Sequence, residues 1–251
     1  MSTPLKEVTV FAPASVANVA VGYDILGFAL EEPGDEIIAR FSDEPGLRIA
    51  AITGDGGRLP YTIAKNTAGY AAQRLLHSMN REDAGIELEI HKKMPFGSGL
   101  GSSAASAAGA VMAINELLGT PYSKKQCLRA AVEGEQVADG AFHADNVAPS
   151  LLGGITLIRS NQELDIIQLP VPEDLCAAVV YPHVEVLTKE ARSILQESVS
   201  LDACIEQTGN VAAFVAALFH RDTDLLSRSL RDVIIEPQRA RLIPHFYEVQ
   251  Q

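Results

Sequence analysis

The sequence contains no tryptophan, only three cysteines and no excess of positive charge. Cys127, Cys176 and Cys204 form no C-x-x-C pair and are odd in number, so a disulfide framework is excluded and reduced core thiols are expected. The chain has 20 Lys and Arg residues and 32 Asp and Glu residues, and its formal net charge of −12 argues against nucleic acid and anionic membranes as partners. No apolar run could span a membrane, and the first residues form no secretion signal. We therefore expect a cytoplasmic protein that acts on a small molecule.

The chain is long and apolar enough for one large or two modest domains, with 251 residues of which 47% are hydrophobic. Its hydrophobic periodicity predicts helices over residues 66–79, 102–118 and 123–138. Strands are predicted over residues 7–11, 35–41, 47–52, 85–92, 153–159 and 165–169.

Two prolines and two acidic residues within residues 170–174 predict a boundary between a domain of residues 1–170 and one of residues 171–251. The second domain is expected to begin with a fully apolar, buried strand over residues 175–181. Helices are then predicted over residues 189–195, 201–219, 222–234 and 237–247.

A glycine-rich segment separates the strand that ends near residue 92 from the helix that starts near residue 102. Glycines at alternate positions let the backbone approach a ligand, and the helix N-terminus offers unpaired N–H groups and the positive end of its dipole. Such a terminus binds phosphate. The alternative is a plain connection in which Ser102 is an ordinary N-cap. The predicted phosphate-binding residues are Pro95, Gly97, Ser98, Gly99, Leu100, Gly101, Ser102 and Ser103.

This segment departs from the two familiar nucleotide-binding patterns. A Walker loop would end in Gly-Lys-Ser/Thr, and no lysine follows the last glycine here. A dinucleotide fingerprint would place its third glycine where this chain has Ser102. The remaining pattern, G-x-G-x-G followed by Ser102 and Ser103, supplies two hydroxyls that can bond phosphate oxygens or ligate Mg²⁺.

Two further segments carry polar residues in apolar surroundings. Asn18 and Asp24 lie in an apolar loop after the first strand, where they either face something polar or bond the loop's own backbone. Glu135 shares a helix face with Asp139, and a carboxylate facing two serines is the minimum that Mg²⁺ needs when ATP supplies the other oxygens. The alternatives are a solvated helix charge for Glu135 and a structural role for His143.

Three blocks together, residues 13–27, 95–106 and 135–154, resemble the homoserine kinases of the GHMP small-molecule kinase superfamily. The resemblance implies an α+β, two-domain GHMP kinase fold with a ribosomal-protein-S5-domain-2-like N-terminal part and a ferredoxin-like C-terminal part. That second part is expected to be incomplete, because no glycine-rich loop follows Gly209. The resemblance also implies phosphorylation of the L-homoserine hydroxyl in threonine biosynthesis, with ATP and Mg²⁺.

The resemblance assigns roles to residues at matching positions. Ser103 and Glu135 would hold Mg²⁺, and the catalytic set would be Glu135, Ser103, Asp24 and Arg192. An arginine fork suits the substrate carboxylate, and Asp24 is assigned to binding because an ordinary carboxylate is a poor base for an alcohol. The implied homoserine pocket consists of Asn18, Asp24, His143, Asn146, Thr188, Arg192 and Arg239.

Other interpretations stay open. The chain could be another kinase of the superfamily acting on a different alcohol, or a ligand-binding relative or fragment without turnover. A dehydrogenase is disfavoured because the dinucleotide fingerprint is incomplete. A homodimer is also left open.

Overall fold

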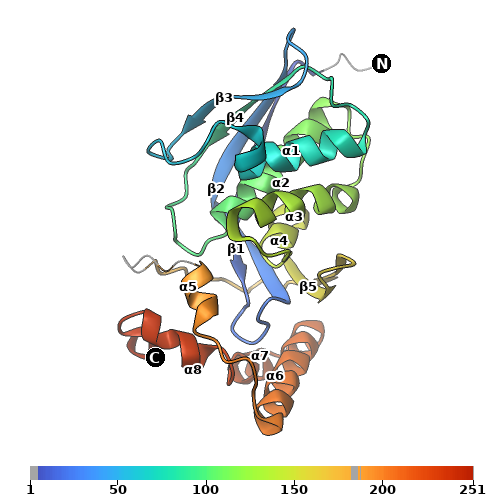
Figure 1. The fold of residues 1–251 in the computed structure, drawn as a ribbon. Helices are drawn as coiled ribbons and strands as arrows, with labels where there is room; N and C mark the ends of the chain where they lie inside the picture. Colours follow the sequence, from blue (N-terminus) through green and yellow to red (C-terminus); the bar gives the residue numbers. More distant parts are fainter. Residues whose placement is uncertain (1–4, 182–185, 187, 251) are drawn as a thin grey trace.

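The computed structural model describes residues 5–181, 186 and 188–250. Within this part of the chain, six strands form one sheet in the order β3-β4-β2-β5-β6, with β1 paired to β2 (Figure 1). The β3 and β4 strands are parallel, and the other pairs are antiparallel. The strands are β1 (Glu7–Ala17), β2 (Leu26–Phe41), β3 (Leu47–Thr53), β4 (Ile86–His91), β5 (Ile155–Ser160) and β6 (Asp165–Leu169).

The short 3-10 helix η1 (Ile63–Lys65) and the helix α1 lie between β3 and β4 in the sequence, and α2, α3 and α4 lie between β4 and β5. In space, α1 to α3 lie together beside the sheet (Figure 1). The alanine-rich α2 approaches the sheet so closely that a Cβ on Gly109 would lie 2.7 Å from Ile37 Cγ1. The α3 helix begins with a capping box, in which Ser123 and Gln126 bond each other's backbone N–H. The helices are α1 (Thr67–Ser78), α2 (Ser102–Leu117), α3 (Lys124–Asp139) and α4 (Val147–Leu152).

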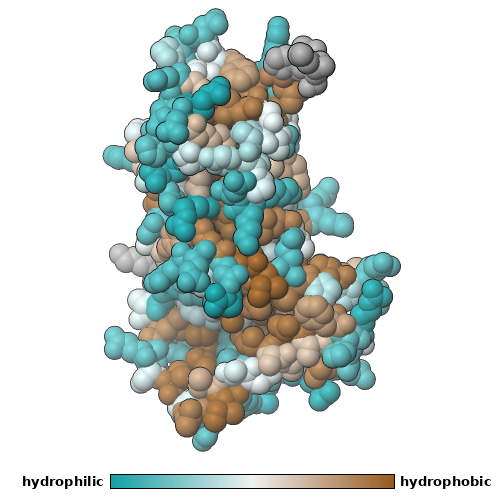
Figure 2. Space-filling model, turned by 90° about the vertical axis from the view of Figure 1, so that its right-hand side faces the viewer, coloured by the Kyte–Doolittle hydropathy of each residue, from teal (hydrophilic) through white to brown (hydrophobic). Residues whose placement is uncertain are grey.

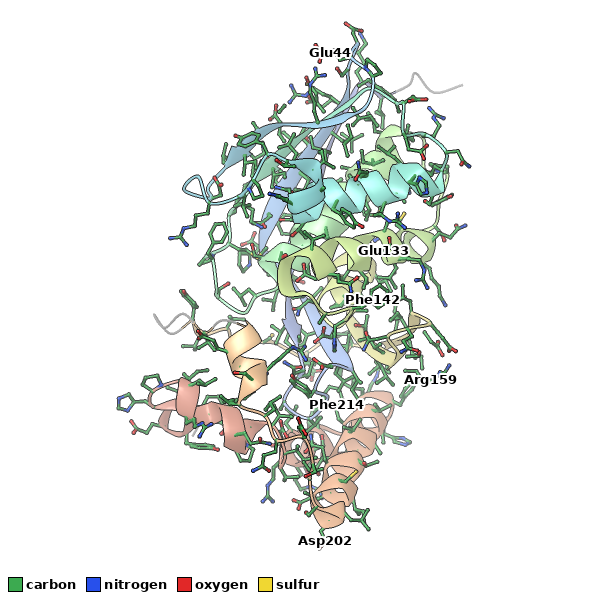
Figure 3. The ribbon with its side chains drawn as sticks, in the orientation of Figure 1. Glu44, Glu133, Phe142, Arg159, Asp202 and Phe214 are labelled. Atoms are coloured by element: carbon green, nitrogen blue, oxygen red, sulfur yellow. The ribbon has the colours of Figure 1, made fainter. Side chains whose placement is uncertain are left out.

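The C-terminal elements lie below this layered part in Figure 1. Phe214 and Leu218 of α6 pack against Val21 and Leu26 in a second core cluster, and Figure 3 labels Phe214 at this contact. Hydrophobic side chains also gather on the surface at the level of α6 (Figure 2). The elements are α5 (Thr188–Ser193), α6 (Leu201–His220), α7 (Thr223–Ser229), α8 (Glu236–Arg239), η2 (Ala240–Leu242) and α9 (Phe246–Gln250).

The buried strand predicted over residues 175–181 is wrong. The segment is irregular and exposed, with Val180 at 69% of its full accessibility, and none of the described strands pairs with it. An apolar run forms a strand only where a neighbour takes up its backbone hydrogen bonds. The predicted helix over residues 237–247 is also interrupted, because Pro244 forces Ile243 into an extended conformation. The helix predicted over residues 222–234 ends at Ser229.

Three smaller predictions need correction. The strand predicted over residues 7–11 continues to Ala17, with a register shift between Pro13 and Ser15 that accommodates the proline. No helix is predicted between residue 138 and the strand at residue 153, where the structure has α4 (Val147–Leu152). Of the three cysteines expected in the core, only Cys127 is buried.

No helix in the described residues combines the length and the apolar composition needed to cross a membrane.

Candidate active site

A cavity of about 670 Å³ lies between the layered part and the C-terminal helices. Segments far apart in the sequence line it: the loop after β1, the glycine-rich loop, α3, the loop before α4, α5 and α8. The predicted residues that it brings together are Asn18, Asp24, Gly97, Ser98, Gly99, Leu100, Gly101, Ser102, Ser103, Glu135, His143, Asn146, Arg192 and Arg239. Pro95 is exposed and is not in this lining. The side chains of Thr188 and Asp139 lie outside what the structure describes.

The glycine-rich loop has the backbone conformation that its sequence predicts. Gly97, Gly99 and Gly101 have φ angles of 67°, 71° and 62°, which side-chain-bearing residues rarely adopt. A Cβ on Gly101 would lie 2.2 Å from Ser15 Oγ and 2.7 Å from Asn146 Oδ1, so this position also lacks space for a side chain. Gly101 is the N-cap of α2 and Ser102 is its first residue, so the alternative of Ser102 as an ordinary N-cap is wrong.

Two helix N-termini converge on this loop. Thr67, the first residue of α1, places its hydroxyl 3.3 Å from Ser103 Oγ near the start of α2. Ser98 Oγ is buried and makes no hydrogen bond among the described residues. Unpaired N–H groups, two positive dipole ends and a hydroxyl without a partner together make a site for an anion.

A buried ion pair supports the loop from behind, and no prediction named it. Lys92 pairs with Asp35, and its Nζ donates to Ser102 O at 2.8 Å and Ser106 Oγ at 2.6 Å. Asp35 Oδ1 accepts from Lys93 N at 2.8 Å. Burial lowers the pKa of Lys92, and Asp35 opposes that effect. The sequence did carry a signal that Lys92 is buried. Ile86, Leu88 and Ile90 alternate along β4 on its buried face, and residue 92 continues that alternation.

Glu135 faces the same cavity as Ser103. Its charge, like that of Asp35, opposes the lowering of the pKa of Lys92 by burial. Glu133 points elsewhere, as the helical spacing predicts, and forms an ion pair with Arg74 of α1 (Figure 3). Among the described residues, no three His, Cys, Asp or Glu side chains cluster as a protein-only metal site would require.

The loop between β1 and β2 forms the opposite end of the cavity and is conformationally strained. Asn18, Val19, Ala20 and Asp24 have φ angles of 70°, 45°, 55° and 60°. A β-branched residue such as Val19 is a true outlier there. Asn18 Oδ1 accepts a hydrogen bond from Asp24 N at 3.0 Å, so this side chain does bond the loop's own backbone while it lines the cavity. Strain of this kind persists where surrounding contacts hold it, commonly at functional sites.

Asp24 and Arg192 form a two-pronged ion pair at this end. Arg192 Nη1 and Nη2 donate to the two carboxylate oxygens at 2.9 and 2.7 Å, and Nη1 also donates to Tyr23 Oη at 3.0 Å. The hydrogen bonds with Asp24 raise the pKa of Arg192. His143 Nδ1 lies 3.3 Å from Asp24 Oδ2 without hydrogen-bond geometry. Arg192 Nε is buried and has no hydrogen-bond partner among the described residues.

Two more residues at this end were not predicted from the sequence. The Tyr23 ring lies under both guanidinium groups, 5.4 Å from Arg192 Cζ and 5.8 Å from Arg239 Cζ. Burial and the neighbouring Asp24 raise the pKa of Tyr23. Asp145 is buried and lines the cavity, and burial followed by Asp24 raises the pKa of Asp145 to about 6.

The comparisons with known proteins agree with this geometry. A family model described as "GHMP kinases N terminal domain" matches residues 64–154. A homoserine kinase of Chlorobium phaeobacteroides strain BS1 is 47% identical over 98% of this chain and 80% of its own length. The chain belongs to the homoserine kinase family. A second homoserine kinase, from Chlorobaculum tepidum, is 46% identical over 98% of this chain and 79% of its own length.

Solved structures extend the likeness to the fold. The crystal structure of homoserine kinase from Cytophaga hutchinsonii matches with a TM-score of 0.96 and 51% identity, covering 99% of this chain and 79% of that one. Phosphomevalonate kinase of Streptococcus pneumoniae, at 12% identity and a TM-score of 0.64, covers 96% of this chain and 80% of that one and shares the fold alone. The predicted family and the predicted α+β GHMP kinase fold are therefore confirmed. The predicted division at residue 170 stays a prediction.

Proposed function

We propose that this protein transfers the γ-phosphoryl group of ATP to the side-chain hydroxyl of L-homoserine, giving O-phospho-L-homoserine in threonine biosynthesis. The observation that carries the proposal is a single cavity with an anion-binding backbone at one end and paired arginine and aspartate side chains at the other. A phosphoryl donor and a zwitterionic acceptor fit these two ends. The similarity to homoserine kinases supports the same reaction.

The glycine-rich loop would hold the triphosphate. Its backbone N–H groups and the buried hydroxyl of Ser98 are the available donors, and the Lys92–Asp35 pair keeps the start of α2 in place. The cavity continues past this loop to Leu59, Asn66 and Phe96, which offer the nucleoside a mixed apolar and polar wall.

The donor set fits Mg²⁺. Ser103 and Glu135 face one cavity beside the phosphate loop, and hard oxygen ligands of this kind, completed by phosphate oxygens, suit Mg²⁺. When bound, the ion neutralises charge on the transferring phosphoryl group. Ser103 is fixed for this role by its position in the first turn of α2 and by its contact with Thr67.

The arginine end would bind the amino-acid part of the substrate. Arg192 and Arg239 suit the carboxylate, and Asp24 suits the ammonium group, once the Asp24–Arg192 pair has opened to admit the substrate. Asn146, which accepts from Ser15 Oγ at 3.0 Å, lies between this end and Gly101. We place the reacting hydroxyl there, in line with the γ-phosphoryl group, so that catalysis depends on positioning rather than on a strong base.

The alternatives are less well supported. A kinase for a neutral alcohol has no use for the charged groups around Asp24, and a ligand-binding relative has no use for Glu135 beside the phosphate loop. The net charge of −12 supports a small-molecule partner rather than nucleic acid or an anionic membrane. Cytoplasmic location and a homodimer stay predictions.

An ADP-release assay with ATP and Mg²⁺ tests the proposal. The acceptors are L-homoserine, L-serine, galactose, mevalonate and none. We expect release that depends on L-homoserine and exceeds the rate with every other acceptor. Faster release with a neutral alcohol, or equal release without an acceptor, would overturn the assignment.

A further inference from the structure

The strained loop between β1 and β2, residues 18–25, needs contacts that hold it, because its positive φ angles are unfavourable by themselves. Apolar packing supplies part of this hold: Val21 is 2% exposed and packs against Phe214 and Leu218 of α6. Such packing is not directional. It does not by itself fix where the cavity-facing side chains of Asn18 and Asp24 lie, so the loop also requires directional contacts.

Gln207 of α6 supplies a directional contact to this loop. Its Nε2 donates to Val21 O at 2.7 Å, and its Oε1 accepts from Val233 N at 2.9 Å. Val233 lies in the segment between α7 and α8. The amide uses its donor on one segment and its acceptor on the other, so a single side chain joins the strained loop to the segment that leads into α8.

Hydrogen bonds also fix the segment that leads into α8. The carboxylate of Asp232, which is 7% exposed, accepts from Ile234 N at 2.8 Å, Ile235 N at 2.9 Å and Glu236 N at 3.0 Å. Bonds of this kind from an aspartate to nearby backbone N–H groups build a turn. The turn starts α8, which carries Arg239, so the contact from Gln207 reaches the support of Arg239.

We propose that Gln207 is a positioning residue for the amino-acid end of the cavity. The inference rests on the proposed function, in which Asp24 suits the ammonium group of the substrate and Arg239 suits its carboxylate. Gln207 sets the spacing between these two groups by tying their segments together, and so selects a ligand with the charge separation of an amino acid. Both of its hydrogen bonds go to segments of the amino-acid end, so its loss should weaken L-homoserine binding and leave ATP binding unchanged.

The strained loop should remain folded without Gln207. Asn161, in the turn between β5 and β6, donates from Nδ2 to Asp24 O at 3.2 Å and holds the other end of the loop. Loss of the bond to Val21 therefore lets the loop shift, while the packing of Val21 on α6 is kept.

The test measures ligand affinity by calorimetric titration of Gln207→Glu and Gln207→Met. An ionised carboxylate can accept from Val233 N but cannot donate to Val21 O, whereas a protonated carboxyl can do both. Methionine keeps a long unbranched side chain without the amide donor. At about pH 8 we expect both variants to bind L-homoserine about 10-fold more weakly than the unchanged protein, with ATP affinity unchanged.

Lowering the pH to about 5, close to the ordinary pKa of a glutamate, should shrink the loss in Gln207→Glu and leave that in Gln207→Met as it was. Each variant is compared with the unchanged protein at the same pH, so that titration of other groups in the site cancels. Recovery in the glutamate variant alone identifies the donated bond to Val21 O as the cause.

Asn210→Asp is the matched control. Asn210 lies one turn further along α6 and donates from Nδ2 to Arg231 O at 2.9 Å, so this variant gains the same charge and also loses a donor. That bond goes to the segment between α7 and α8 and not to the strained loop, so the affinity for L-homoserine should stay unchanged.

Four results would overturn the inference. They are unchanged L-homoserine affinity in Gln207→Met, an equal loss of affinity for L-homoserine and ATP, a loss in Gln207→Glu that is the same at both pH values, and a loss of the same size in Asn210→Asp. The second would mean a general structural role, and the last two would mean that the bond to Val21 is not the cause.

Titration measures binding without turnover, which separates this inference from the proposed function. If L-homoserine binds more tightly to the unchanged protein than to Gln207→Met but receives no phosphate, the proposed function fails and the role of Gln207 stands. If phosphate is transferred and the two affinities are equal, the role of Gln207 fails and the proposed function stands. Absence of L-homoserine binding to both proteins overturns both.

Discussion

The two ends of the cavity are built in different ways. The phosphate end is mainly backbone: positive φ angles at three glycines within five residues, and two helix N-termini. The amino-acid end is made of side chains from segments far apart in the sequence, such as Asp24 and Arg192, which are 168 residues apart. A binding site made of backbone groups tolerates substitutions that leave the backbone conformation unchanged. A site made of charged side chains depends on the identity of each side chain. Changes at the two ends should therefore affect different ligands.

The largest expected effect is on turnover, at the metal site. Glu135→Gln keeps the size of the side chain and removes its charge, so kcat should fall about 1,000-fold while the fold persists. Glu133→Gln is the control on the same helix, because Glu133 pairs with Arg74 outside the cavity. Steady-state ADP release and circular dichroism measure the two properties. Equal activity of both variants would return Glu135 to the role of a solvated helix charge.

A smaller effect is expected at the backbone of the phosphate end. Gly101→Ala would bring Cβ within 2.2 Å of Ser15 Oγ, so the loop must shift, and the KM for ATP should rise about 100-fold. Gly119→Ala is the matched control: its φ is +84° at the other end of α2, and a Cβ there meets nothing within 4 Å. Equal rises in KM for both variants would show that strain, and not the shape of the site, causes the loss.

Arg192→Lys should affect the amino-acid end alone. The variant keeps the charge but loses the two-pronged donor, so the KM for L-homoserine should rise about 10-fold and the KM for ATP should stay unchanged. Arg159→Lys, at an exposed ion pair with Asp165, is the control for the chemical change. A loss shared by both substrates would contradict the separation of the two ends.

The smallest effect is on stability. The pKa of Asp145 is raised from 3.8 to about 6, so the folded state binds more protons than the unfolded state between these pH values, and stability falls as the pH rises through them. Asp145→Asn removes this penalty, although the buried amide keeps a cost of its own. Above pH 6 the variant should be more stable by about 1 kcal/mol, or about 3 °C in Tm.

Thermal unfolding of the unchanged protein and Asp145→Asn at pH 7.5 and pH 4.5 measures this effect. The gain should be present at the higher pH and small at the lower one. A gain of the same size at both values would show that the charge of Asp145 is not its cause.

The two ends also differ in how far the sequence predicts them. The phosphate loop could be predicted because its glycines and serines lie close together in the sequence and its backbone conformation depends on these residues alone. The burial of Lys92 could also have been predicted, from the alternation of buried residues along β4. The pairing of Asp24 with Arg192 depends on tertiary packing, and their shared pocket followed from the family resemblance rather than from spacing. The apolar run over residues 175–181 was mispredicted for the same reason, because whether it forms a strand depends on a neighbouring strand that the sequence does not reveal.

Phosphorus NMR of the reaction products tests the central claim most directly. With ATP, Mg²⁺ and L-homoserine, we predict one new phosphomonoester resonance on the side-chain oxygen of homoserine, formed in equal amount with ADP. Formation of ADP with inorganic phosphate alone, or no loss of ATP while both ligands bind, would contradict a cavity that aligns the homoserine hydroxyl with the γ-phosphoryl group.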